Sequence, residues 1–395
     1  MAGEARELLR RPGEPQRTTF LELFFDLAFV VTLIQLSHVL ANDLSWRGAF
    51  RTLVLLFAMG WIWYITVAIT DRYNPHRPVI QVLVIATLVG TLVLVAAVPA
   101  AFGERGLVFA GAYVAIQIGR PLFTLFALRE RKLRRRPARA LCWFSVSAVP
   151  WLVGAGADGA TRDVLWTLAV AVDYVAFALG RPTPGLGRSS SSEWRIVAEH
   201  LAERYRLFFI IALGELILVT SLTFSGNDMA VDKSAAFLTS IAITVLLWRI
   251  YIYRAGEVLA TAIEASPDPL RLAISTLSAH MVMMAGIVVT AVGVELVIAH
   301  PLGHTPPDWT AVILGGPALF LVGRAQFEHA VLRRVSRDRP VGLLVLAVIV
   351  PGALRVPPLV VALAATVVLT GIAITDTVRT RQSASEKPSP PGGPL

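Results

Sequence analysis

Cysteine is almost absent from this sequence, since Cys142 is the only one among 395 residues. This excludes a disulfide framework and a cysteine metal cluster, because both need several cysteines. Charged residues are also scarce at 16%, whereas hydrophobic residues make up 55% of the chain. The mean hydropathy is +0.65. This composition is unusual for a soluble domain and typical of a protein that crosses a membrane many times.

The sequence also lacks the motifs of common enzyme classes. It has no phosphate-binding loop with Gly-Lys-Ser/Thr, no nucleophile elbow and no metalloprotease helix. His300 and His304 are four residues apart in a loop, but no third metal ligand is evident beyond Asp308. Residues 1–19 are polar and contain no apolar core of a cleavable signal. We therefore expect no enzymatic activity, no cofactor and no bound metal.

Apolar runs of about 17 residues or more recur along the chain, which is the length needed to cross a hydrocarbon core about 30 Å thick. Helices are expected, because open sheet edges leave backbone groups unsatisfied in lipid. The predicted fold is an all-α membrane bundle of about twelve helices. The predicted spans are 20–40, 48–70, 79–101, 107–128, 139–156, 161–179, 205–224, 235–253, 272–298, 311–332, 341–354 and 359–375. Whether the short eleventh and twelfth segments both cross stays open.

Lys and Arg are concentrated in alternate loops of this pattern, with the densest run at residues 129–139. Cytoplasmic loops carry the excess of Lys and Arg, so both termini are expected in the cytoplasm. The net charge of +9 is interpreted as this topology signal, with binding of anionic lipid or nucleic acid by the basic run as the alternative. The expected partner is the lipid bilayer rather than a nucleic acid, and a homo-oligomer is possible.

A Gly-, Pro- and Ser-rich stretch at residues 180–192 divides the chain into two similar halves. Trp63 in the second span aligns with Trp248 in the eighth, and Arg120 in the fourth aligns with Arg324 in the tenth. Six spans in each half predict two copies in the same orientation. The predicted organisation is a cytoplasmic tail (1–19), a first six-helix repeat (20–179), a linker and interfacial helix (180–204), a second six-helix repeat (205–375) and a disordered tail (376–395).

Ionisable residues inside the predicted spans are the main functional candidates. Glu22 and Asp26 are four residues apart, so they share one helix face. Asp26, Arg120, Glu215 and Arg324 all lie roughly 9–14 Å from the cytoplasmic end of their spans, at 1.5 Å per residue. Such charges are costly in lipid and are expected to pair. We predict that Asp26 pairs with Arg120 and that Glu215 pairs with Arg324.

Two motifs resemble those of the bacterial low temperature requirement A (LtrA) family. They are Glu22-Leu-Phe-Phe-Asp26-Leu-Ala-Phe-Val30 in the first span and His200-x-x-Glu203-Arg204, followed by Leu213-Gly214-Glu215, in the seventh. The resemblance covers roughly residues 18 to 375. It implies a bacterial multi-pass inner-membrane protein linked by its name to growth in the cold. It implies no particular reaction or substrate.

The function predicted from these residues is transport of a small solute or ion through a site of buried acid–arginine pairs. The predicted binding residues are Glu22, Asp26, Arg120, Glu215 and Arg324. Helical geometry places His200 and Arg204 close to the face of Glu215, so a cytoplasmic approach is predicted along His200, Glu203 and Arg204. The alternatives are an ion channel, or a structural or sensory membrane protein whose buried pairs only hold helices together.

Overall fold

Each of the twelve predicted spans coincides with a helix in the computed structural model, which describes residues 8–10, 17–128, 131–189, 197–226, 230–252 and 255–385. The helices of the first half are α2 (Phe20–Asn42), α3 (Trp46–Arg72), α4 (Pro78–Ala97) with the short η1 (Val98–Ala100), α5 (Gly106–Ala127), α6 (Arg131–Ala155) and α7 (Gly159–Ala178). Those of the second half are α8 (Ala198–Ser225), α9 (Val231–Ile252), α10 (Ala255–Glu264), α11 (Pro269–Ala299), α12 (Pro307–Leu332), α13 (Asp338–Ala353) and α14 (Pro358–Ser385).

Ten helices among the described residues are long and apolar enough to cross a membrane. Helices α7 and α13 match predicted spans but do not belong to this set, and the short α10 was not predicted at all. The chain is therefore an all-helical membrane bundle. The described residues contain no β-strand, only two isolated bridges.

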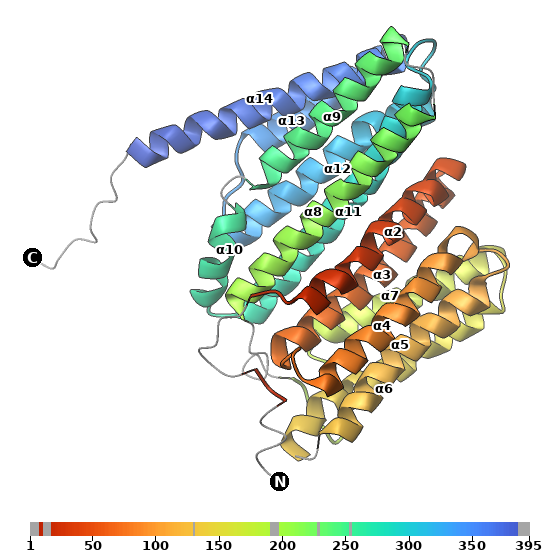
Figure 1. Ribbon diagram of the computed structural model, residues 1–395, viewed down its shortest axis with the longest axis vertical. Coiled ribbons are helices and arrows are strands. Elements are labelled where there is room, and N and C mark those ends of the chain that lie inside the picture. Colours follow the sequence, from red (N-terminus) through yellow and green to blue (C-terminus); the bar gives the residue numbers. More distant parts are fainter. Residues whose placement is uncertain are drawn as a thin grey trace, which may run out of the picture.

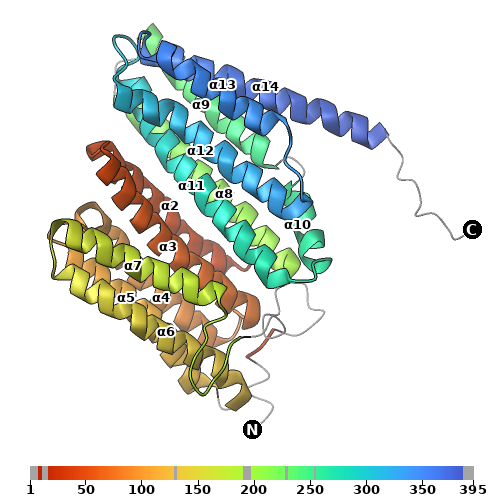
Figure 2. The same ribbon diagram turned by 180° about the vertical axis from the view of Figure 1, so that it is seen from behind.

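The helices form two bundles that follow the two halves of the sequence (Figure 1). Helices α2 to α7 make one bundle, coloured red to yellow, and α8 to α14 make the other, coloured green to blue. Their interface consists of α2 and α3 from the first bundle and α8 and α11 from the second. The reverse view shows the same division, with α14 on the far side of the second bundle (Figure 2).

Glycines allow α11 and α12 to pack closely along their length. Gly286 and Gly293 on α11 face α12, and Gly316 and Gly323 on α12 face α11. A Cβ atom added to Gly316 would lie 2.5 Å from the backbone nitrogen of Thr290. Small residues serve this purpose in membranes, where van der Waals packing between helices replaces the hydrophobic driving force.

The segment predicted as a linker is an ordered turn in its described part, residues 180–189. The amide of Ser189 donates to the Gly180 carbonyl oxygen at 2.8 Å, which closes the turn. The Arg139 guanidinium on α6 donates to the Leu186 carbonyl oxygen at 2.6 Å. Gly180, Gly185 and Gly187 have φ angles of 73°, 71° and 68°. These glycines supply left-handed backbone conformations for the turn rather than the flexibility of a linker.

The predicted interfacial helix is different in the structure. Residues 190–196 lie outside the described part, and from Ala198 onward the chain is already α8, which continues without a break to Ser225. His200 and Arg204 in its first turns are fully buried. The start of α8 is therefore packed inside the protein against the first bundle, because its polar side chains have partners there.

Candidate functional site

Helices α2 and α8 lie side by side and run in the same direction. Glu22 contacts His200, and Asp26 contacts Arg204, and both pairs are 178 residues apart in the sequence. A constant offset means that the two helices are parallel, since contacts between antiparallel helices would have a constant sum of residue numbers. The acidic motif of the first half therefore faces the basic motif of the second half, turn by turn.

The first layer of this interface is centred on His200. Its Nε2 atom lies 2.8 Å from Glu22 Oε1, and its Nδ1 atom lies 3.2 Å from Asp71 Oδ1 on α3. Glu22 also forms a capping box with Thr19 at the start of α2, which holds its second oxygen. The Arg10 guanidinium lies 3.6 Å from Glu22. His200 therefore lies between two carboxylates, and the Arg10 guanidinium also lies 3.3 Å from its Nε2 atom.

Glu203, the third residue of the predicted approach, faces the N-terminal segment. Its Oε2 atom accepts a hydrogen bond from the Thr18 amide at 2.9 Å. The side chain is half-buried. Glu203 therefore ties the segment that precedes α2 to α8.

The second layer is a fully buried ion pair. Arg204 Nη2 lies 2.7 Å from Asp26 Oδ1, and the indole Nε1 of Trp63 donates to the same oxygen at 2.9 Å. Neither residue has any exposed surface. Within the described residues, the other carboxylate oxygen of Asp26 and two guanidinium nitrogens of Arg204, Nε and Nη1, have no hydrogen-bond partner. The pair is thus joined by one hydrogen bond rather than by two parallel ones, and hydrogen-bonding atoms of both side chains are left unused.

Aromatic rings close the interface beyond this pair. Trp63 stacks on Phe208 with a centroid distance of 4.1 Å, and Phe29 contacts Phe208 edge-on at 5.8 Å. Tyr205 stacks on His280 of α11 at 4.2 Å. These rings separate the ion pair from the next polar position on α8.

That next position is Glu215, which is fully buried. Neither of its carboxyl oxygens has a hydrogen-bond partner among the described residues. The Ser37 hydroxyl of α2 lies near Glu215, but it donates to the Ile34 carbonyl oxygen at 2.9 Å. Ser37 and Glu215 have the same sequence offset as the two pairs below them. Glu215 is therefore the next layer of the α2–α8 interface, 11 residues or about 16 Å beyond Arg204.

The predicted pairing of Asp26 with Arg120 is wrong, because Asp26 pairs with Arg204 instead. Arg120 lies within the first bundle and donates to the Ile62 carbonyl oxygen and the Thr66 hydroxyl of α3, both at 3.1 Å. It also donates to the Gln117 side chain. The prediction of a common depth for the acids is wrong as well, since Asp26 is level with Arg204 and not with Glu215.

The predicted pairing of Glu215 with Arg324 is also wrong. Arg324 donates from Nε to the Ile250 carbonyl oxygen of α9 at 3.0 Å, and its Nη1 lies 3.3 Å from Glu328 one turn further along α12. Arg339 of α13 forms ion pairs with Glu328 and with Asp376 of α14. Its Nη2 atom lies 3.0 Å from Glu328 Oε1 and 2.7 Å from Asp376 Oδ2. This network ties four helices of the second bundle together, α9, α12, α13 and α14.

Sequence reasoning missed Asp71, Glu328, Arg339 and Asp376. Asp71, Glu328 and Arg339 lie close to an end of their helices, and Asp376 lies just beyond the predicted twelfth span, where a solvated charge is the ordinary interpretation. The four-residue spacing of Arg324 and Glu328 places both on one helix face, and this spacing indicates their ion pair. Within the described residues, no group of three or more His, Cys, Asp or Glu side chains is placed to hold a metal ion.

Comparison with known proteins agrees with this architecture. The sequence model of the family described as Bacterial low temperature requirement A protein (LtrA) matches residues 17–374. An uncharacterized protein from Rhizobium meliloti (strain 1021) is 34% identical over 331 residues, which cover 82% of this chain and 80% of the relative. No solved structure matches the chain. The family match includes both motifs of the α2–α8 interface and nearly all of the described helices, so the chain belongs to the bacterial low temperature requirement A (LtrA) family of multi-pass helical membrane proteins.

Proposed function

We propose that this protein transports a small solute or ion across the bacterial inner membrane, and that the path follows the α2–α8 interface. The observation that carries the proposal is Glu215, a fully buried carboxyl group inside a candidate membrane helix with no hydrogen-bond partner among the described residues. An acidic side chain at the centre of a membrane helix costs about 2.5–3.5 kcal/mol on insertion scales. Such a group is neutralised by a proton or a bound cation, which makes it a binding site.

The charged layers at the start of α2 and α8 suit the entrance of this path. His200 has a carboxylate on each side, Glu22 and Asp71. When it gains or loses a proton, it therefore keeps a hydrogen bond to at least one of them. Arg204 keeps two donors beyond its contact with Asp26 within the described residues. These donors are available to an anionic group or to a rearranged Asp26. His200 and Arg204 are therefore able to exchange hydrogen-bond partners, which is required if binding of a solute or ion is coupled to movement of the bundles.

The position of the interface supports alternating access. Many transporters move one structural repeat against the other around a central site. Here the site lies between two bundles that correspond to the two halves of the chain, and its residues come from α2, α3 and α8 (Figure 1). A relative movement of the bundles would separate Glu22 from His200 and Asp26 from Arg204, opening the interface toward Glu215.

Two further observations support the proposed duplication into parallel six-helix repeats. Arg120 of α5 donates to a backbone carbonyl of α3, and Arg324 of α12 donates to a backbone carbonyl of α9. These are the helices that the alignment of the two halves makes equivalent. The parallel course of α2 and α8 is also expected for the first helices of such repeats. We accordingly propose that α7 and α13 cross the membrane, with both termini cytoplasmic, and that α10 does not cross.

The proposal predicts that Glu215→Gln abolishes transport without unfolding the protein. Replacing a buried carboxyl group that has no counter-charge among the described residues by a neutral amide leaves the melting temperature equal or higher. A thermal-shift screen of amines, amino acids, organic anions and metal cations identifies a ligand, whose uptake is then measured in proteoliposomes. We expect uptake to fall at least about 100-fold, since the glutamine amide neither binds a proton nor carries the charge for a cation.

Glu199→Gln is the matched control, because Glu199 is exposed in the first turn of the same helix. It should transport normally. Unchanged uptake in Glu215→Gln would contradict the proposal. Ohmic current without saturation would identify a channel. A fall in melting temperature in the absence of any ligand or flux would identify the structural or sensory alternative.

A further inference from the structure

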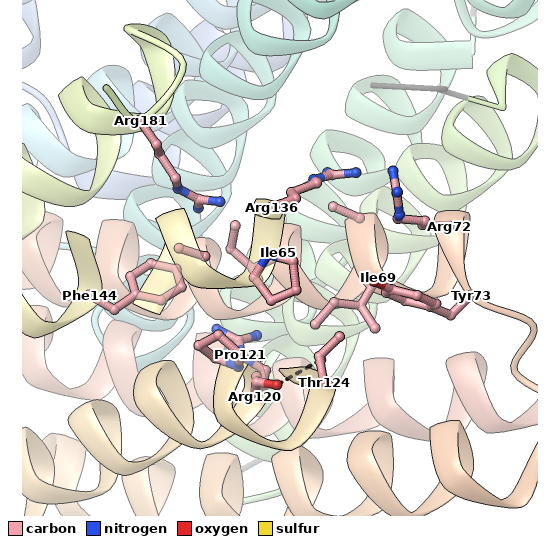
Figure 3. A pocket seen from close by; sticks show the side chains of 13 residues that line it. Ile65, Ile69, Arg72, Tyr73, Arg120, Pro121, Thr124, Arg136, Phe144 and Arg181 are labelled. Carbon is pink, nitrogen blue, oxygen red and sulfur yellow. Dashed lines mark hydrogen bonds between the residues drawn. The ribbon is translucent and has the colours of Figure 1, made fainter. Parts of the chain in front are cut away.

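A second feature lies outside the α2–α8 interface, within the first bundle. Four arginines line one cavity of about 70 Å³ between α3, α5, α6 and the turn after α7. They are Arg72, Arg120, Arg136 and Arg181. Figure 3 shows Arg72, Arg136 and Arg181 along one side of this arginine pocket and Arg120 on the other. Among the described residues that line it, none carries a carboxylate.

The four side chains differ in exposure, which indicates how the pocket opens. Arg120 and Arg181 are 3% and 5% exposed and form its inner part. Arg72 and Arg136 are half-buried and lie near the ends of their helices. The opening therefore lies at the arginine-rich end of the first bundle, where α3 ends and α6 begins.

The like charges act on one another. Arg136 is close enough to Arg72 and Arg181 to be repelled by both, and Arg181 also repels Arg120. Burial lowers the pKa of Arg181 to about 10. Asp173 attracts Arg120 and Arg181, and it also accepts a hydrogen bond from the Tyr113 hydroxyl at 2.8 Å. The two inner arginines thus lie near one buried acid, Asp173, which is not part of the lining.

Two buried donors in the pocket are unused. Within the described residues, Arg120 Nε and Arg181 Nη2 have no hydrogen-bond partner. Leaving a buried charged donor unsatisfied is costly. Planar guanidinium groups bind the oxygens of phosphate with two hydrogen bonds at once, and several arginines around a small space are typical of phosphate recognition. The cavity has room for a group of that size.

We propose that the arginine pocket binds a phosphate group, either in a phospholipid headgroup or as free phosphate. A neighbouring apolar hollow of about 410 Å³ runs between α4 and α5, and Arg120 lines both. Its walls include Val82 and Val93, whose side chains are 56% and 44% exposed and would face lipid. Because Arg120 lines both, an acyl chain in the hollow would lie next to a phosphate in the pocket, so the lipid form is expected to bind more tightly.

Two variants test the pocket, each with a matched control. In Arg136→Gln and Arg181→Gln one lining charge is removed, whereas Arg135→Gln and Arg188→Gln remove exposed arginines from the same helix and the same turn. The full-length protein is purified in phosphate-free buffer, and its melting temperature is followed with increasing inorganic phosphate at constant ionic strength. The second arm compares nanodiscs of phosphatidylglycerol with nanodiscs of phosphatidylcholine.

We expect phosphate, phosphatidylglycerol or both to stabilise the wild type and the two controls. In each lining variant the apparent affinity should fall about tenfold or more, the effect of losing one charge-assisted hydrogen bond. Stabilisation by phosphatidylglycerol alone identifies the lipid headgroup, and stabilisation by phosphate identifies the free anion. Equal responses in lining variants and controls, or no stabilisation by either probe, would overturn the proposal. If Arg181→Gln does not fold, Arg136→Gln alone decides.

Discussion

Arg204→Ala is expected to lower the free energy of unfolding by about 3–5 kcal/mol, because it leaves the buried Asp26 carboxylate without its cation. The loss is large because the site excludes water, with both side chains fully buried. Trp63 would still donate to Asp26, but a single neutral donor does not replace the guanidinium. Unfolding monitored by tryptophan fluorescence in mixed micelles measures the change.

A double-mutant cycle separates the net contribution of the ion pair to the free energy of unfolding from the destabilisation caused by removing only one partner. Asp26→Leu combined with Arg204→Met replaces both charges by apolar groups of similar size, and this double variant should recover most of the lost stability. Arg206→Ala is the control, since Arg206 is exposed on the same helix. The assigned pairing would be refuted if Arg204→Ala behaved like Arg206→Ala.

The same cycle bears on the role of the interface. If the pair only holds the bundles together, the stable apolar double variant should keep every other property of the wild type. If the proposed path is correct, this variant should fold and yet lose uptake of the ligand found in the screen. The two outcomes separate a packing role from a functional one, because stability is similar in both.

Gly316→Ala should destabilise the second bundle by about 1–3 kcal/mol, and Gly316→Leu by more, because added atoms in a tight contact force the backbones apart. The new Cβ would lie 2.4 Å from Thr290 Oγ1 and 2.5 Å from the Thr290 nitrogen, so a side-chain rotation cannot remove the clash. Gly323→Ala meets Met283 and Ala279 in the same way. Thermal unfolding and the yield of monodisperse protein in detergent report the effect.

Gly315→Ala supplies the internal control, because nothing lies within 4 Å of a Cβ atom at this neighbouring position. Its effect should be neutral or slightly stabilising, as Ala favours the helix more than Gly does. The double variant Gly316→Ala/Gly323→Ala should cost less than the sum of the single changes, since helices already forced apart accommodate the second methyl group. Similar results for Gly315→Ala and Gly316→Ala would contradict the observed packing of α11 against α12.

Hydropathy located the helices well because each apolar run carries its own signal. All twelve predicted spans correspond to helices, with ends that differ by few residues in most cases. However, α6 and α8 begin several residues earlier than predicted, and α14 continues to Ser385, so residues 376–385 are helical and not part of a disordered tail as predicted. Family membership was also predicted from the Glu22 and His200 motifs, and it is confirmed. In the segment predicted as a linker, the described residues 180–189 form a hydrogen-bonded turn, which composition alone does not distinguish from a linker.

The composition and order of apolar segments determined by themselves that this chain is an all-helical membrane protein, because lipid requires every spanning segment to satisfy its own backbone. Only the tertiary structure decided which charges meet. Which acid meets which arginine depends on how two helices are rotated and offset along their axes, and the residues of such a pair are 178 positions apart in the sequence. The depth of a residue within its own span specifies neither the rotation nor the offset. For that reason Asp26 forms an ion pair with Arg204 rather than with Arg120, and Glu215 lies beside Ser37 instead of an arginine.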